Sequence, residues 1–295
     1  MDIQNLSAFI SVSETGSFSR AAEKLFITQP AVSKRIQSLE QELNTQLFDR
    51  IGKKVQLTEA GISLLPSAKR IMTELDESRR VINNLSGKVS GPLRLGTSHH
   101  IGLHRLPPVL RAYSALYPDV DLDIHFMDSE EACEAVLKGE LELAIATLPE
   151  QKIDNLHTEI IWHDPLGIVV NRESSLTRLK ELSLNQLLQY PAILPSQNTF
   201  TRALMEKELE LHKKPMKIAM ETNYLETIKM MVSIGLGWSV LPKSMLSDDL
   251  ACLEIKGIRM ERQLGVAYHG ERSLSNAAKM MLQSLRESII KENAN

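Results

Sequence analysis

The chain has 295 residues, of which 43% are hydrophobic and 4% aromatic, and its formal net charge is −3. This length exceeds one ordinary domain, so two or three folded units with aliphatic cores are expected. The composition excludes a disordered chain. The near-neutral charge excludes a protein that is basic throughout, so any nucleic-acid site must be local.

Cysteine content argues against a disulfide-rich protein, and hydropathy argues against a secreted or membrane-spanning one. Cys133 and Cys252 are too few for a disulfide framework. Cys133 has Val136 and Leu137 at the spacing of a helix core face, so structural roles for both thiols are favoured over a redox switch. The start, MDIQNLSAFI, lacks the pattern of a signal peptide, and the longest weakly polar run, MMVSIGLGWSVLP, is shorter than the roughly 20 residues of a membrane helix. We therefore expect a soluble, cytoplasmic protein without membrane contact.

Short helical patterns fill the first 45 residues. Leu6 and Phe9 share one face of a first helix, which TGS ends, and Ser17 can cap a second helix, FSRAAEKL. Thr28 can cap a third. Pro30 then falls in the first turn of the third helix, where a missing N–H costs nothing. Two crossing helices joined by a short turn predict a helix-turn-helix.

The third helix has an apolar side and a polar side. Its core stripe recurs at i, i+4, i+7 and i+11 and consists of Val32, Ile36, Leu39 and Leu43. The polar side has no acidic residue, as expected of a surface that faces phosphate, and the major groove of B-DNA admits one such helix. The residues expected to reach bases or nearby phosphates are Gln29, Ser33, Lys34 and Gln37, with Pro30 against a thymine methyl.

The next segment, LFDRIGKKVQLTEAG, predicts two short strands, 48–50 and 55–57, around a basic wing. Arg50, Lys53 and Lys54 suit phosphate or minor-groove contact. Lys and Arg total seven in residues 1–60, and so do Asp and Glu, so a three-helix protein-interaction module is the alternative. The full set of candidate DNA-contacting residues is Ser17, Ser19, Arg20, Thr28, Gln29, Pro30, Ser33, Lys34, Arg35, Gln37, Arg50, Lys53, Lys54 and Thr58.

A long helix follows, capped by Thr58 and running to about Leu85. Its apolar stripe follows a 3-4 spacing, typical of a short coiled coil. Nothing nearby in sequence would cover this stripe, so a seam between two chains is favoured over an ordinary amphipathic helix. The stripe consists of Leu65, Ala68, Met72, Leu75, Arg79 and Ile82.

Beyond the linker SGKVSGP, residues 86–92, the pattern changes to alternating strands and helices. LRLGTS, VDLDIHFM, LELAIATL, LGIVV and PAILPS read as strands. Helices are expected through residues 106–113, in EEACEAVLKG, and from about Thr199 and Leu225. This alternation predicts mostly parallel sheets with covering helices.

These segments together resemble a known family. GSFSRAAEKL, TQPAVSKRIQSLE, LFDR and LTEAG, in this order, resemble the N-terminal domain of LysR-type transcriptional regulators. Tyr117–Pro118, LAIAT and GLGWSVLP are similar to the effector domain of the same family, so the resemblance covers essentially the whole chain. It implies a winged helix-turn-helix domain (1–58), a linker and dimerisation helix with a hinge (59–90), and an effector domain (91–295).

The resemblance also implies the organisation of the effector domain and the partners. The domain would be an α/β fold of two lobes like type 2 periplasmic binding proteins, with crossovers near Ile161–Leu166 and Gly265–Tyr268 and an effector between the lobes. Lobe 1 would hold about residues 91–163 and 268–295, and lobe 2 about residues 164–267. A homodimer or homotetramer would grip a roughly palindromic operator in double-stranded DNA and contact RNA polymerase.

Polar residues follow several of the predicted strands. In such sheets ligands sit beyond the carboxyl ends of strands, at helix N-termini that favour anions, so a small oxyanion or carboxylate is expected. By resemblance, Ser98, Thr147 and Thr199 match positions where hydroxyls of the family meet the effector; plain helix capping is the alternative. The candidate effector-binding residues are Thr97, Ser98, His99, His100, Thr147, Ser196, Asn198, Thr199, Phe200, Thr201, Asn223 and Tyr224.

Metal and enzyme sites are not expected. His99 and His100 are no generic feature of the family pattern, and His100 and His104 could hold a metal ion, but the sequence suggests no third ligand. The chain lacks G-x-S-x-G, H-E-x-x-H, a P-loop and a G-x-G-x-x-G after a strand. We predict a DNA-binding regulator modulated by a small effector, without a cofactor. The alternative is a solute-binding or metal-sensing module without sequence-specific DNA binding.

Overall fold

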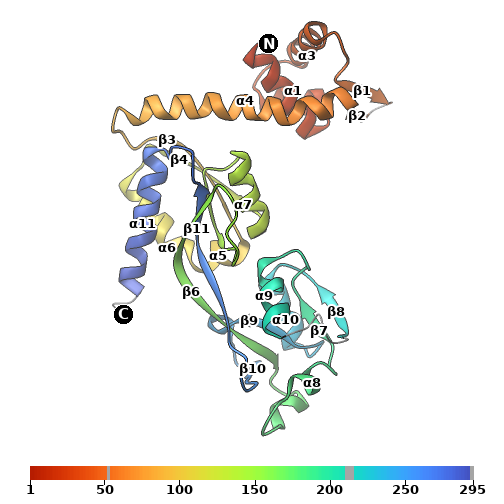
Figure 1. The fold of residues 1–295 in the computed structure, drawn as a ribbon, viewed down its shortest axis with the longest axis vertical. Coiled ribbons are helices and arrows are strands. Elements are labelled where there is room, and N and C mark those ends of the chain that lie inside the picture. The colour runs from red at the N-terminus through yellow and green to blue at the C-terminus, as the bar shows by residue number, and fades with distance from the viewer. Residues whose placement is uncertain (52–53, 210–215, 293–295) are drawn as a thin grey trace. The chain divides into compact units, whose positions relative to one another are not determined.

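The chain forms two compact units, Met1–Leu85 and Ser86–Asn295. The computed structural model describes residues 1–51, 54–209 and 216–292 (Figure 1). No helix within these ranges is both long and apolar enough to cross a membrane. The predicted linker, SGKVSGP, begins where the first unit ends.

The first unit is a winged helix-turn-helix followed by a long helix. Each helix begins after a residue whose side chain accepts a backbone N–H of the first turn, which satisfies one of the unpaired donors there. The strands β1 and β2 pair antiparallel, so the predicted wing hairpin forms. The elements are α1 (Ile3–Thr15), α2 (Phe18–Lys24), α3 (Gln29–Leu43), β1 (Phe48–Ile51), β2 (Lys54–Leu57) and α4 (Glu59–Asn84).

The core of the first unit holds α3 with its polar side outward. Val32, Ile36 and Leu39 of the predicted stripe are at most 2% exposed. They pack with residues of α1 and α2 and with the wing, where the ring of Phe48 lies 5.4 Å from that of Phe9. Full burial of a side chain of this size stabilises a fold by about 1.5–3 kcal/mol. Apolar packing therefore fixes the orientation of α3.

The first half of α4 packs against the core of its own unit. Ala68 is fully buried in that core, and Leu65 and Met72 pack against it. The sequence favoured a seam between two chains for the whole stripe. These three residues instead pack within their own chain, because α1, distant in sequence, lies against α4. The second half of α4 exposes apolar side chains, among them Val81 and Ile82.

The second unit consists of two lobes that share a seven-stranded sheet, ordered β10-β6-β11-β5-β3-β4 with β9 also paired to β6, and the second lobe has a further sheet of β7 and β8. The first lobe has β3 (Gly91–Thr97), α5 (His99–His104), α6 (Leu106–Leu116), β4 (Val120–Phe126), α7 (Ser129–Lys138), β5 (Leu143–Thr147) and α11 (Asn276–Glu292). The second lobe has η1 (Ser175–Arg178), α8 (Leu184–Leu187), β7 (Ala192–Leu194), α9 (Phe200–Glu208), β8 (Ile218–Glu221), α10 (Leu225–Ser233), β9 (Ser239–Pro242), η3 (Lys243–Met245) and β10 (Leu250–Leu253).

Two long strands, β6 (Leu156–Asn171) and β11 (Met260–His269), run from one lobe to the other (Figure 1). In β6, Ile161 belongs to the core of the first lobe and Leu166 to that of the second. In β11 the change falls between Met260 and Leu264, so the crossover predicted at Gly265–Tyr268 lies too late in the chain. A strand that is buried in both lobes shows no break in its pattern where it leaves one core for the other, so the sequence did not reveal this point.

Most strand pairs of the second unit are antiparallel, which corrects the expectation of mostly parallel sheets. β6 pairs antiparallel with β9, β10 and β11, and β11 with β5. Among the described strands of this unit, parallel pairing is confined to β3 with β4, β3 with β5, and β7 with β8. Alternating strands and helices pair in parallel when each helix carries the chain back to the end of the sheet at which the previous strand began. β6 and β11 instead pass from one lobe to the other, so they run antiparallel to their neighbours.

The two cysteines differ in environment. Cys133 on α7 is buried in a core cluster of the first lobe, and burial raises the pKa of its thiol to about 12. A thiol of that pKa is almost entirely protonated at neutral pH and is therefore unreactive. Cys252 on β10 is exposed, so the expected core role holds for Cys133 alone.

Candidate functional site

The outer side of α3 is accessible. Gln29, Pro30, Lys34 and Gln37 are exposed. Gln29 Nε2 donates a hydrogen bond to Ser33 Oγ at 3.0 Å, one turn along the helix. The surface that the sequence assigns to DNA thus presents amide, hydroxyl and ammonium groups, the types that read base edges and phosphates.

The other DNA candidates divide by their contacts. Arg35 donates to Gln4 Oε1 at 2.7 Å and so holds the start of α1 against α3. Ser19 and Arg20 are exposed near the start of α2. The candidates whose hydroxyl caps a helix are Ser17, Thr28 and Thr58. The wing candidates lie outside the described residues: this holds for Lys53 entirely and for the side chains of Arg50 and Lys54.

A glutamate near the end of α3 is turned toward the protein's own backbone. Glu40 Oε1 accepts a hydrogen bond from the N–H of Leu47 at 2.8 Å, where the chain enters β1. Its negative charge is therefore engaged away from the polar side of α3. The sequence analysis missed this role because it depends on the path of the loop between α3 and β1.

The second candidate site is a cleft between the two lobes of the second unit. It has a volume of about 50 Å³, enough for a few water molecules or a very small ligand in this closed arrangement. The first lobe contributes α5, the start of α7 and the end of β5, and the second lobe contributes the starts of α9 and α10. The lining residues are Ser98, His99, His100, Asp128, Ser129, Glu130, Thr147, Pro195, Thr199, Thr201, Asn223, Tyr224, Leu225 and Arg262.

Eight of the twelve predicted effector residues line this cleft: Ser98, His99, His100, Thr147, Thr199, Thr201, Asn223 and Tyr224. The other four do not line it: Thr97, Ser196, Asn198 and Phe200. The residues that the prediction missed include Asp128, Ser129, Glu130 and Arg262. The sequence could have indicated the first three, because they directly follow the predicted strand VDLDIHFM, just as the predicted effector residues follow other strands. Arg262 had none.

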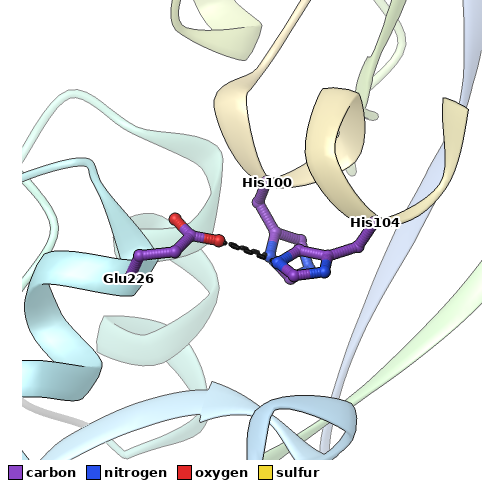
Figure 2. A group of neighbouring side chains, drawn as sticks. All are labelled: His100, His104 and Glu226. Carbon is purple, nitrogen blue, oxygen red and sulfur yellow. Dashed lines mark hydrogen bonds and ion pairs between the residues drawn. The ribbon is translucent and has the colours of Figure 1, made fainter. Parts of the chain in front are cut away.

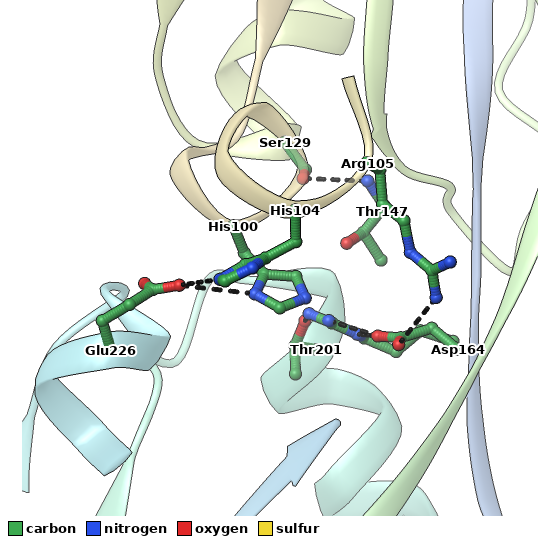
Figure 3. A network of polar contacts seen from close by, with 9 residues as sticks. His100, His104, Arg105, Ser129, Thr147, Asp164, Thr201 and Glu226 are labelled. Atoms are coloured by element: carbon green, nitrogen blue, oxygen red, sulfur yellow. Dashed lines mark hydrogen bonds and ion pairs between the residues drawn. The ribbon is translucent and has the colours of Figure 1, made fainter. Parts of the chain in front are cut away.

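Several cleft hydroxyls are already engaged. Thr199 accepts the N–H of Arg202 at 3.2 Å and donates to the carbonyl of Ser196 at 2.9 Å, so it caps α9. The backbone N–H of Thr147 donates to Ser129 Oγ at 3.0 Å, a contact drawn in Figure 3. Ser98, by contrast, makes no capping hydrogen bond to α5. Of the three positions that the resemblance implied, Thr199 therefore has a hydroxyl engaged in capping, whereas the bond at Thr147 uses its backbone N–H and not its hydroxyl.

Contacts between the lobes across the cleft include two hydrogen bonds and one ring contact. Asn223 Nδ2 donates to Asp128 Oδ2 at 2.6 Å, and the N–H of Phe200 donates to the carboxylate of Glu130. The ring of His99 packs edge-on against that of Tyr224, with centroids 4.8 Å apart. Burial raises the pKa of Glu130, while its hydrogen bond from Phe200 partly opposes this shift.

A buried ion pair joins Arg262, which lines the cleft, to Asp164. Arg262 Nε donates to Asp164 Oδ2 at 3.0 Å, and Arg262 Nη1 donates to Thr201 Oγ1 at 3.2 Å. The charge of Arg262 is thus balanced by Asp164 within the protein. Burial, followed in size by the positive charge of Arg262, lowers the pKa of His100 to about 4, so its imidazole is neutral at pH 7.

A histidine pair and a glutamate meet at the edge of the cleft (Figure 2). His100 and His104 project from α5 toward Glu226 of α10, and the three offer ligand atoms within 4.8 Å of one another. The sequence suggested no third ligand for the two histidines. The fold supplies one from the opposite lobe, 122 residues away from His104.

An accessible helix on a winged helix-turn-helix unit, joined to a two-lobed unit with a polar cleft, defines a DNA-binding regulator that responds to a small ligand. Two family models match the chain. The bacterial regulatory helix-turn-helix protein, lysR family, matches residues 3–62, and the LysR substrate binding domain matches residues 86–289. The chain belongs to the LysR family of DNA-binding transcription regulators, and it is not an enzyme.

The chain is similar to known regulators along its whole length. It is 29% identical over 288 residues to the HTH-type transcriptional activator CmpR of Synechocystis, covering 96% of this chain and 94% of that protein. It is 65% identical over 108 residues to an HTH-type transcriptional regulator of Azotobacter vinelandii, covering 37% of this chain and 75% of the relative. The crystal structure of full-length CbnR with its target DNA shares the fold, with a TM-score of 0.67, 22% identity and coverage of 98% and 100%.

Proposed function

We propose that the effector is a small carboxylate or oxyanion that enters the cleft and replaces Glu130 at the start of α9. The hydrogen bond from the N–H of Phe200, the first residue of α9, to the Glu130 carboxylate carries this proposal. Helix N-terminal N–H groups favour negative charge. In the closed cleft, a carboxylate of the opposite lobe takes the place that an effector anion would take.

The exchange is physically favourable for Glu130. Its pKa is raised by burial, so its ionised form is destabilised in the cleft relative to water. An effector anion that bonds to Phe200 lets Glu130 return to solvent. Ser98, whose hydroxyl makes no capping bond, and Asn223 line the same cleft and can contact the rest of the ligand.

The test compares Glu130→Gln with Glu131→Gln, which removes an equal charge from the exposed neighbour on α7. Thermal unfolding of the full-length protein is followed with acetate, succinate, sulfate and phosphate as probes. We expect at least one anion to raise the melting temperature of the wild type, and Glu130→Gln to bind it more tightly because the competing carboxylate is gone. Stabilisation by neutral sugars only, or tighter binding in both variants, contradicts the proposal.

The DNA contacts are proposed from the same residues that the sequence indicated. Gln29, Ser33, Lys34 and Gln37 read base edges in the major groove, and Pro30 contacts a thymine methyl. The exposure of these side chains on the outer side of α3 supports this assignment. Arg50, Lys53 and Lys54 of the wing are proposed to contact phosphates or the minor groove.

We further propose that two chains pair through the second half of α4, giving a homodimer or, by pairing of dimers, a homotetramer. The apolar side chains that are exposed to water there support this, because a second chain would bury them. Two recognition helices in one dimer would bind a roughly palindromic operator. The regulator acts where the DNA is, so we place it in the cytoplasm, in contact with RNA polymerase at the promoter.

A further inference from the structure

We propose that the second unit binds a divalent transition-metal ion through His100, His104 and Glu226, at the joint between the lobes. The site is distinct from the anion position at the start of α9, and it goes beyond the proposed effector. Among the described residues, these three form the group of histidine and acidic side chains that converges closely enough to hold an ion. Figure 2 shows the two imidazoles of α5 facing the carboxylate of α10.

The ligand spacing fits a tetrahedral ion. Bonds of about 2.0–2.2 Å at tetrahedral angles place neighbouring ligand atoms about 3.3–3.4 Å apart. His104 Nε2 lies 3.0 Å from Glu226 Oε1, and His100 Nδ1 lies 3.5 Å from the same oxygen. These two distances lie on either side of the required value. The three ligand atoms lie within 4.8 Å of one another, so side-chain rotations that bring the two imidazole nitrogens closer together would complete the site. The helical i, i+4 spacing of the two histidines holds both rings on one side of α5.

An independent observation concerns the buried imidazole. His100 is 5% exposed, and within the described residues neither of its ring nitrogens makes a hydrogen bond. Its 3.5 Å contact with Glu226 has the distance of an ion pair without the geometry of a hydrogen bond. A buried polar group without a partner destabilises a protein, and a bound metal ion would give the imidazole one.

The donor set selects the class of metal. Two imidazole nitrogens and one carboxylate oxygen are the ligands of zinc sites that keep a fourth position open. The same set suits cobalt and nickel, whereas calcium and magnesium prefer oxygen ligands only. The fourth position would take water. Because α5 belongs to the first lobe and α10 to the second, the ion ties the two lobes together and favours the closed cleft.

The test uses the full-length protein without a histidine tag, freed of metal with a chelator and titrated calorimetrically with zinc chloride. Two variants, His104→Ala and Glu226→Gln, remove one ligand each from opposite lobes. The control, His125→Ala, removes a histidine of similar exposure, 45% against 49%, that also contacts a carboxylate, Asp123. Because both altered ligands are partly exposed, the variants are expected to fold, and melting without metal verifies this.

We expect one zinc ion per chain, with affinity reduced about 100-fold or more in both ligand variants and unchanged in the control. Loss of a direct ligand should exceed the 10–100-fold effect of losing an outer partner. Zinc should also raise the melting temperature of the wild type and of the control only, and cobalt(II) should give the visible absorption of a four-coordinate ion. Absence of zinc binding to the wild type, or wild-type affinity in His104→Ala and Glu226→Gln, overturns the proposal. Neither result depends on the anion that occupies the cleft.

Discussion

Asn223 of the second lobe donates a hydrogen bond to Asp128 of the first lobe at 2.6 Å. The same side chain accepts the backbone N–H of Ser196 through its oxygen at 2.9 Å. One amide therefore fixes its own loop and reaches across the cleft. The start of α7 makes a second such contact, since Glu130 accepts the N–H of Phe200. The closed arrangement of the lobes depends on these polar contacts as well as on packing.

We expect Asn223→Ala to weaken this closure. The change leaves the N–H of Ser196 and the carboxylate of Asp128 without a partner, which costs about 1–3 kcal/mol in total at a partly exposed site. The measurement is urea unfolding of the full chain, followed by tryptophan fluorescence. Trp162 and Trp238 report on the first and second lobes respectively. An unchanged urea midpoint would show that the contact contributes nothing.

Asn198→Ala is the matched control for that prediction. Asn198 is exposed, lies in the loop that precedes α9 and does not line the cleft. The same chemical change there should leave the midpoint within experimental error. Equal destabilisation by both variants would assign the effect to the loop rather than to the contact between the lobes.

The sequence predicted the features that depend on residues close together in the chain and missed those that depend on residues far apart. Thr28 and Pro30 act within one helical turn, so the start of α3 was predictable. Glu226 approaches His104 from 122 residues away, and no local pattern encodes such a meeting. The first half of the stripe on α4 was assigned to a seam for the same reason, because Ala68 packs in the core of its own unit, which the pattern of α4 cannot reveal.

The cleft shows the same division. Positions such as Thr147 and Thr199 were found because ligand sites follow the ends of strands, a rule that needs no distances. Arg262 was not found because it lies within β11, and its place in the cleft depends on where that strand crosses between the lobes. The pairing of β11 with β5 and β6, and not the local sequence, sets where β11 crosses between the lobes.

We expect Lys34→Ala to lower the preference for operator over random DNA. An exposed lysine on the outer side of α3 can contact a base or a nearby phosphate, and a lost base contact costs about 1–3 kcal/mol of discrimination. Gel-shift titrations with operator and with random duplex at one salt concentration measure the ratio. Lys279→Ala removes the same charge from α11 of the second unit and should leave the ratio unchanged. Equal ratios for both variants would remove Lys34 from the reading surface.

We expect Gly61→Ala to destabilise the first unit although the residue lies in a helix. In an open helix position alanine is favoured over glycine by about 1 kcal/mol. Here an added Cβ would lie 2.3 Å from the carbonyl oxygen of Leu47 and 2.8 Å from Leu57 Cδ2, so the backbone of α4 must shift. We expect a net loss of about 1–3 kcal/mol, as for overpacked cores. Thermal melting measures it, with Gly270→Ala as control because its nearest contact is 3.7 Å. A raised melting temperature for Gly61→Ala would contradict the steric account.

The last prediction concerns the pairing of two chains. Met72 is half-buried against the core of its own unit, so a charge there would destabilise that unit as well as any pairing of chains and would not test association alone. Ile82 is 67% exposed and shares its side of α4 with Ile71, Leu75 and Leu85. A glutamate at position 82 would be buried without a partner in a paired helix, and such burial costs several kcal/mol. We therefore expect Ile82→Glu to stay folded, to lose assembly mass in light scattering and to lose cooperative operator binding. Ile62, 61% exposed on the opposite side of α4, provides the control Ile62→Glu, which should keep its assembly mass. If Ile82→Glu keeps both its mass and its operator affinity, the second half of α4 does not join two chains.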